Sequence, residues 1–257
     1  MESGRLCFES SEDAVSYCVF TALLSDSRAL KQLVGHIAKE EVHDEVDLLL
    51  WGNKIDLKNK RALTYEPLNE VRNRLEGDIL RFKTEPDIML LVPRKIVICI
   101  EAKFGSKNPV AIDRPETSGE KPKQLNRLIE RYYEKNDLLK SDSIFDFTRV
   151  SQSSFYEQLF RNIVFAASMA KIEKAEKWFV VNLRSQHLMN MKRGEPESAP
   201  VMRATRSLLR PPYKSRFAHI TWEEIHEWLV KDNPALHDLS WYMKNKSLRC
   251  GRAFNVF

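Results

Sequence analysis

Three charged residues beside two short apolar runs carry the strongest candidate chemistry in this chain of 257 residues. Asp87 precedes the first run, and Glu101 and Lys103 follow the second. Side chains alternate between the two faces of a strand, so Glu101 and Lys103 are expected to point to one side and Ala102 to the other. Two neighbouring carboxylates repel unless a hard cation such as Mg²⁺ lies between them, and an adjacent ammonium group can hold a water molecule or offset the charge of a phosphate.

A hairpin would bring these three side chains together. Residues 88–92 and 96–100 are apolar throughout and are joined by a link that contains Pro93, which predicts two antiparallel strands covered on both faces. The start of the first strand then lies beside the end of the second, near the centre of a sheet. We therefore expect the charged residues to converge at the edge formed by the strand ends. The alternative is that they only mark those ends, because charged residues make up 30% of the chain.

The rest of the pattern predicts an α/β domain. Apolar residues at helical spacing indicate helices at residues 11–24, at about 30–37, from about 124 and, buried on most sides, at 155–171. Strands are expected at 46–51 and 177–183, whereas residues 69–80 fit either a helix or a strand. The order of helix, strands, helix and strand predicts one domain over residues 1–257, with its core near residues 80–185.

Three further segments have distinct expectations. Residues 104–123 are rich in Pro, Gly, Ser, Asn and Lys and predict a long loop of the kind that often carries function. Residues 184–216 predict a basic, irregular stretch. Thr221 and Glu224 form the pattern of a capping box and predict that a helix begins there.

Several other classes of site are missing from the sequence. It contains no phosphate-binding glycine loop, no nucleophile elbow and no HExxH zinc motif. The six histidines are dispersed, so we expect them at the surface or at helix caps. The apolar runs are far shorter than the roughly 20 residues that a membrane helix needs, and the N-terminus lacks the order of a secretory signal. These patterns predict a cytoplasmic protein that does not enter a membrane.

The net charge of +5 is compatible with an anionic partner. Residues 184–216 hold eight Lys and Arg residues against two Glu residues. Within them, Arg203, Arg206 and Arg210 are candidate contacts to the phosphates of a nucleic acid, and residues 104–123 are a second candidate segment. The alternative for both segments is an ordinary solvated surface.

The sequence Pro86-Asp87, followed after thirteen residues by Glu101-Ala102-Lys103, resembles the signature of the PD-(D/E)XK nuclease superfamily. The likeness includes the hairpin and the apolar strand that leads into Glu101, and it covers about residues 10–185. Residues 186–257 are left as a C-terminal extension. The resemblance implies a restriction-endonuclease-like core, in which a mixed central sheet is flanked by helices, with helical additions at both ends.

The resemblance also implies an activity. By analogy with the superfamily, Asp87, Glu101 and the carbonyl group of Ala102 would bind Mg²⁺, for which Mn²⁺ can substitute, and Lys103 would position the attacking water. The chain would be an endonuclease that hydrolyses phosphodiester bonds, with DNA as the expected substrate. The alternative is a catalytically inactive nucleic-acid-binding or assembly module of the same fold. Whether two chains pair as a homodimer stays open.

Members of this superfamily often carry an acidic residue on the first helix and a glutamine on the helix after the motif. Glu12 fits the first position on the apolar face of its helix, although it could equally serve only the helix dipole. Gln152 and Gln158 both offer a frame for the second position. We favour Gln158, with Arg161 close by as a candidate phosphate contact; the alternative for both is a structural hydrogen bond. Glu76 and Glu85 are further acidic candidates.

Overall fold

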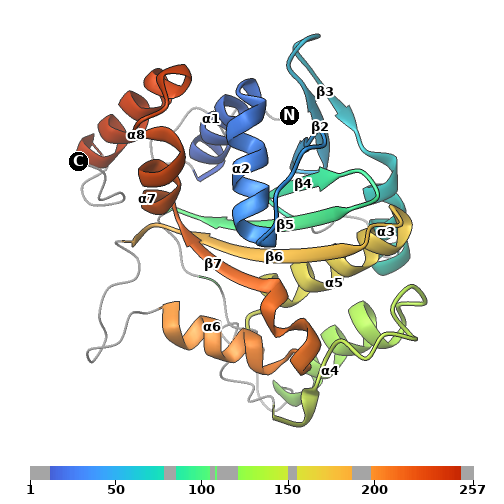
Figure 1. The fold of residues 1–257 in the computed structure, drawn as a ribbon. Helices are drawn as coiled ribbons and strands as arrows, with labels where there is room; N and C mark the ends of the chain where they lie inside the picture. Colours follow the sequence, from blue (N-terminus) through green and yellow to red (C-terminus); the bar gives the residue numbers. More distant parts are fainter. Residues whose placement is uncertain are drawn as a thin grey trace.

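The computed structural model describes residues 12–77, 85–104, 108, 121–149, 155–186 and 198–249, without the side chains of residues 121–124, 198–199 and 247–249. Within this part of the chain, seven strands form one mixed sheet in the order β3-β2-β1-β4-β5-β6-β7 (Figure 1). Neighbouring strands are antiparallel from β3 to β5 and parallel from β5 to β7. Helices cover both faces of the sheet (Figure 1). The predicted α/β fold with a mixed central sheet is therefore confirmed.

The strands have well-defined bounds. They are β1 (Asp47–Leu50), β2 (Asn53–Asp56), β3 (Arg61–Thr64), β4 (Ile88–Val92), β5 (Ile96–Lys103), β6 (Lys177–Arg184) and β7 (Phe217–Thr221). The predicted hairpin is β4 and β5, in which Ile88 lies opposite Ile100 and Val92 opposite Ile96. Its turn is closed by a hydrogen bond from the Lys95 N–H to the Val92 carbonyl group at 2.9 Å. Every residue of both strands is buried, as their unbroken apolar runs predict.

The helices divide between the two faces, as Figure 1 shows. One face carries α1 (Glu12–Ser25), α2 (Ser27–Ala38), α7 (Trp222–Ile225) and α8 (His237–Arg249). The other carries α3 (Glu66–Glu76), α4 (Lys121–Ile129), α5 (Glu157–Ile172) and α6 (Ser198–Ser207). Each layer has its own hydrophobic cluster, and the strand β5 contributes to both: Ile98 and Ile100 pack towards α1, whereas Val97 and Cys99 pack towards α5. The alternation along β5 therefore turns its odd-numbered residues towards α5.

Some expectations need correction. The ambiguous residues 69–80 begin within the helix α3, whose Val71 and Leu75 are buried. The strands β2 and β3 were not predicted, because their residues are half-buried or exposed and show no apolar alternation. The stretch 184–216 is not irregular throughout, since it contains α6 and a 3₁₀ helix at Pro211–Arg216. The many charged residues of this segment obscure its apolar periodicity in the sequence. In the structure, Val201 and Leu208 are buried in the hydrophobic cluster on the α5 side of the sheet.

The C-terminal segment completes the sheet. The strand β7 lies parallel to β6, and Val180 is paired with Phe217. The predicted capping box at Thr221 and Glu224 is present, with Glu224 N–H donating to Thr221 Oγ1 at 3.0 Å and Thr221 N–H donating to Glu224 Oε2 at 2.7 Å. A π-helical turn at His226–Val230 continues from α7, and α8 contacts α1. Among the helices described, none has the length and apolar character needed to cross a membrane.

Candidate active site

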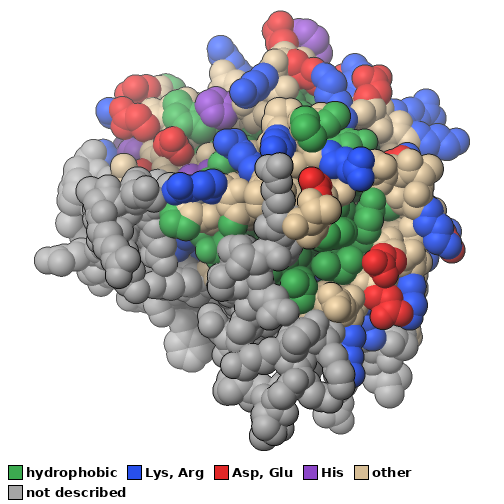
Figure 2. Space-filling view, turned by 90° about the horizontal axis from the view of Figure 1, so that it is seen from below, with side chains coloured by type: hydrophobic (Ala, Val, Ile, Leu, Met, Phe, Trp, Pro, Cys, Tyr) green, Lys and Arg blue, Asp and Glu red, His purple; other side chains and the backbone are tan. Residues whose placement is uncertain are grey.

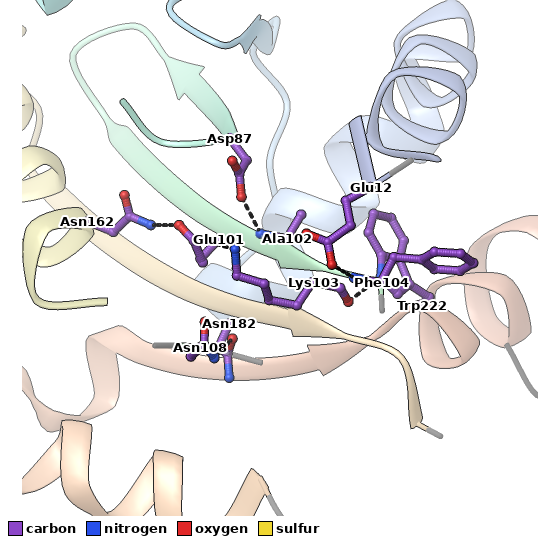
Figure 3. A network of polar contacts seen from close by, with 10 residues as sticks. All are labelled: Glu12, Asp87, Glu101, Ala102, Lys103, Phe104, Asn108, Asn162, Asn182 and Trp222. Carbon is purple, nitrogen blue, oxygen red and sulfur yellow. Dashed lines mark hydrogen bonds and ion pairs between the residues drawn. The ribbon is translucent and has the colours of Figure 1, made fainter. Parts of the chain in front are cut away.

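Asp87 lies where β4 begins, beside the end of β5. Its Oδ2 atom accepts a hydrogen bond of 2.9 Å from the backbone N–H of Ala102 (Figure 3). Its carbonyl group accepts another of 3.1 Å from the N–H of Trp51. The strand β4 begins at Ile88, one residue after Asp87, and its last pair with β5 is Ile88 with Ile100. The Asp87 side chain therefore satisfies the N–H of Ala102, which the antiparallel ladder no longer reaches.

Glu101 is held from two sides on the α5 face of the sheet. The side-chain amide of Asn162, on the helix α5, donates to Glu101 Oε2 at 2.8 Å, and Lys103 Nζ lies 2.6 Å from Glu101 Oε1. The exposed fractions are 3% for Glu101, 7% for Lys103 and 1% for Asn162. The strand periodicity therefore places the carboxylate and the ammonium group on one face, as expected, and in direct contact.

The charges in this site perturb one another. Burial and then the neighbouring Glu101 raise the pKa of Asp87 well above its ordinary value. Burial alone would lower the pKa of Lys103, but Glu101, Asp87 and Glu12 outweigh it, so that the pKa is raised. Lys103 is consequently an ammonium ion at neutral pH. It can hold a water molecule or offset negative charge, but it cannot take up a proton.

Glu12 reaches this site from the other layer. It begins α1, and its Oε1 atom accepts a hydrogen bond of 2.9 Å from the backbone N–H of Phe104, the residue after Lys103 (Figure 3). Its charge contributes to the raised pKa of Lys103. The structure thus places Glu12 beside the motif, and its position in the first turn also suits the helix dipole.

On α5, Asn162 donates a hydrogen bond to the motif residue Glu101. Gln158 lies one turn earlier on this helix, and its Oε1 atom is buried without a hydrogen-bond partner among the described residues. Arg161 forms an ion pair with Glu157 and lies over the ring of Tyr132, 5.2 Å from its centroid. The hydrogen bond from α5 to Glu101 comes from Asn162, and the catalytic role of Gln158 stays a prediction. The sequence signal for Asn162 is an amide directly before the apolar run at residues 163–167, which a buried helix tolerates only where the amide is satisfied.

A polar row continues from the motif across β6 and β7. Asn182 lies opposite Glu101 in the parallel register, and His219 lies opposite Asn182. The side-chain amide of Asn108 donates to Asn182 Oδ1 at 2.9 Å. Burial and then the charge of Arg184 lower the pKa of His219 to about 4, so that the ring is neutral at physiological pH. From the sequence, His219 was expected at the surface or at a helix cap, because no sequence pattern shows that its strand, β7, pairs with β6.

The match to a family model decides the classification. The model of the family described as "Restriction Endonuclease associating with ARP" matches residues 18–246. The chain belongs to this family. No curated protein and no solved structure gives a significant match. The matched range contains the whole of β7 and most of α8, so residues 186–246 of the C-terminal segment, which the sequence resemblance left unassigned, belong to the region that the family model covers. A restriction-endonuclease family indicates nuclease activity, with nucleic acid as the substrate.

The donor atoms at the motif suit a hard cation. No group of three or more His, Cys, Asp or Glu side chains that could hold a metal occurs in the part of the chain described here. The candidate set is therefore two carboxylates and a backbone carbonyl group. The N–H and C=O groups of one strand residue point to the same side, so the carbonyl group of Ala102 faces the side on which its N–H meets Asp87. Oxygen donors alone are what Mg²⁺ and Mn²⁺ prefer. The residues present fit such an ion.

The basic residues predicted to contact nucleic acid have mixed environments. Arg203, Arg206 and Arg210 are all exposed. Arg206 donates to the carbonyl group of Phe217 at 3.1 Å, and Arg210 donates to that of Phe145 at 3.1 Å. Figure 2 shows the Lys and Arg side chains of one face as scattered groups. Most of the predicted phosphate-contacting loop, residues 105–107 and 109–120, lies outside the described residues.

The two other acidic candidates have partners away from the motif. Glu76 is fully buried and accepts a hydrogen bond from the hydroxyl group of Tyr132. Glu85 forms an ion pair with Arg72, with Oε2 lying 3.3 Å from Nη2. The structure therefore gives each of them a structural contact of its own.

Proposed function

We propose that this chain is a Mg²⁺-dependent endonuclease that hydrolyses phosphodiester bonds in DNA. The convergence of Asp87, Glu101 and Lys103 at the end of β5 supports this proposal most directly. Asp87 is partly buried and Glu101 is buried, and the charge of Glu101 adds to the raised pKa of Asp87. Two such neighbouring carboxylates favour a cation between them. A structural ion pair alone would need only one carboxylate.

Each residue has a proposed role. The carboxylates of Asp87 and Glu101 and the carbonyl group of Ala102 would hold the cation, which supplies Lewis-acid polarisation of a phosphoryl oxygen and a lower pKa for water. Lys103 keeps its proton and orients the water that attacks the phosphorus. Asn162 holds one oxygen of Glu101, which leaves the carboxylate with a defined orientation.

The substrate and partner follow from charge and from the family. The surplus of basic residues supports an anionic polymer, and Arg203 is an exposed candidate for phosphate contacts. The family description names an association with ARP, and we propose that this chain has such an association. A homodimer that cuts both strands is a further proposal.

Calorimetric titration with Mn²⁺ tests the metal site. The wild-type protein should bind Mn²⁺, and Asp87→Asn, which removes one charged ligand without changing the size of the side chain, should lose this binding. The raised pKa of Asp87 shows that its charge is unfavourable in the folded protein without a cation, so Asp87→Asn should be at least as stable as the wild-type protein in EDTA. This comparison separates loss of a ligand from loss of the fold. Equal Mn²⁺ binding by both proteins would refute the metal site.

Lys103→Ala tests the chemistry. We expect it to reduce cleavage of plasmid or oligonucleotide DNA by about 100-fold or more, because the ammonium group acts mainly on the transition state, and to leave DNA affinity nearly unchanged. An equal loss of binding and rate would contradict this role. A wild-type protein that binds DNA but not Mn²⁺ and does not cleave would favour the inactive binding module.

A further inference from the structure

The peptide group that joins Lys103 to Phe104 is held at both of its polar atoms. The indole N–H of Trp222 donates to the carbonyl group of Lys103 at 3.1 Å, and the N–H of Phe104 donates to Glu12 at 2.9 Å (Figure 3). Trp222 is fully buried, and Phe104 is 2% exposed. The Trp222 hydrogen bond is buried and the Glu12 hydrogen bond is partly buried. At such sites an unsatisfied backbone group is costly.

The two side chains come from distant parts of the chain. Glu12 is 92 residues before Phe104, and Trp222 is 119 residues after Lys103. Trp222 is the first residue of α7, directly after the capping-box residue Thr221, and its ring meets that of Phe20 on α1 edge to face, with 6.3 Å between centroids. The two contacts are thus built on helices that also pack against each other.

The same segment holds the end of the neighbouring strand. Glu223 accepts a hydrogen bond of 2.8 Å from the N–H of Gln186 and one of 3.3 Å from the hydroxyl group of Ser185. The N–H of Ser185 in turn donates to the Lys103 carbonyl group at 3.2 Å. The beginning of α7 therefore secures the ends of both β5 and β6, where these strands leave the sheet.

We propose that Glu12 and Trp222 are positioning residues that fix the backbone of Lys103, and through it the ammonium group against Glu101. This inference rests on the proposed nuclease function and adds a task for the C-terminal segment. Lys103 is the last residue of β5, and its long side chain has many rotamers, so a defined ammonium position needs a fixed backbone. A misplacement of about 1 Å in a catalytic group can reduce the rate by roughly 100-fold. The competing role for Glu12 is direct metal ligation.

The first test is Trp222→Phe, which removes the indole N–H and keeps an aromatic ring. We expect kcat to fall by about 10-fold to 100-fold and KM to change by less than about threefold, because the substrate contacts stay in place. The matched control is Trp178→Phe at the opposite end of β6, where the buried indole stacks on Tyr213. This control removes the same volume and should retain wild-type kcat. Equal kcat values for Trp222→Phe and the wild-type protein would overturn the proposal.

The second test compares Glu12→Gln with Glu12→Ala. A glutamine oxygen can still accept the Phe104 N–H, so Glu12→Gln should keep kcat within about threefold and Mn²⁺ affinity close to that of the wild-type protein. Glu12→Ala should lose about tenfold or more in kcat. If Glu12 instead ligates the metal, Glu12→Gln will lose Mn²⁺ binding as Asp87→Asn does. That result would overturn the positioning role.

Hydrogen exchange at the Phe104 amide, measured by NMR, gives a readout that does not depend on cleavage. The amide should be protected in the wild-type protein and in Glu12→Gln, and should exchange at least tenfold faster in Glu12→Ala. Equal protection in all three proteins would overturn the proposed contact. A wild-type protein in which the Phe104 amide is protected and Mn²⁺ binds, but which does not cleave DNA, would refute the proposed function. The proposed contacts to the Lys103–Phe104 peptide group would still stand.

Discussion

Replacement of Asn162 by alanine tests how Glu101 is held. The side-chain amide donates a 2.8 Å hydrogen bond to a carboxylate oxygen, and both residues are almost completely buried. A hydrogen bond to a charged group contributes about 1.5 to 3 kcal/mol, and its loss would leave a buried oxygen without a donor. Lys103 still pairs with the other oxygen, so the loss should stay below the roughly 3 to 5 kcal/mol of a fully broken buried ion pair. We expect Asn162→Ala to lower the free energy of unfolding by about 2 to 3 kcal/mol.

A matched variant on the same helix isolates the effect of charge. Ser168 is fully buried, and its hydroxyl oxygen accepts a hydrogen bond of 2.9 Å from the neutral amide of Asn136. Ser168→Ala should therefore cost only about 1 kcal/mol, the usual value for a neutral pair.

Urea unfolding in EDTA, followed by circular dichroism and tryptophan fluorescence, measures both variants. Equal losses for Asn162→Ala and Ser168→Ala would refute the reasoning, because the carboxylate would then add nothing to the hydrogen bond. In the presence of Mn²⁺, Asn162→Ala should also bind the cation more weakly by about tenfold or more, as for other residues that orient a metal ligand.

Two further predictions concern pH and salt. The pKa of His219 is lowered from 6.5 to about 4. The neutral ring therefore stabilises the folded protein above pH 6.5, and this stabilisation, about 3 kcal/mol at most, is lost as the pH falls towards 4. His219→Gln should flatten this part of the pH profile of unfolding. Arg203→Ala should reduce the slope of log DNA affinity against log salt by about one unit. Arg206→Ala and Arg210→Ala should change the slope less and cost stability, about 1 kcal/mol each, because these guanidinium groups donate to backbone carbonyl groups.

Each of these predictions has a contradicting outcome. A His219→Gln profile that runs parallel to the wild-type profile between pH 4 and 6.5 would show that the ring is as easily protonated in the folded as in the unfolded state. If all three arginine variants reduce the salt slope equally at unchanged stability, their guanidinium groups contact phosphates and not the backbone.

The hairpin and its charged residues could be predicted because they depend on local pattern. Two apolar runs with a proline in the link between them specify β4 and β5, and the two-residue period of a strand places Glu101 and Lys103 on one face. The helix α5 could be predicted in the same way, because a long, mostly apolar segment of this length is typical of a buried helix. The strands β2 and β3 were not, because their side chains are half-buried or exposed and carry no periodic signal.

The sequence by itself thus determined which residues form the motif and which strands carry them. The tertiary structure alone decided their partners: Asn162 for Glu101, and Glu12 and Trp222 for the peptide after Lys103. These contacts join segments 61, 92 and 119 residues apart. Local periodicity states which side of an element is apolar, but the rotation and depth at which two elements pack depend on the whole core. A polar partner is set by that packing, and so it cannot be read from the spacing of residues along the chain.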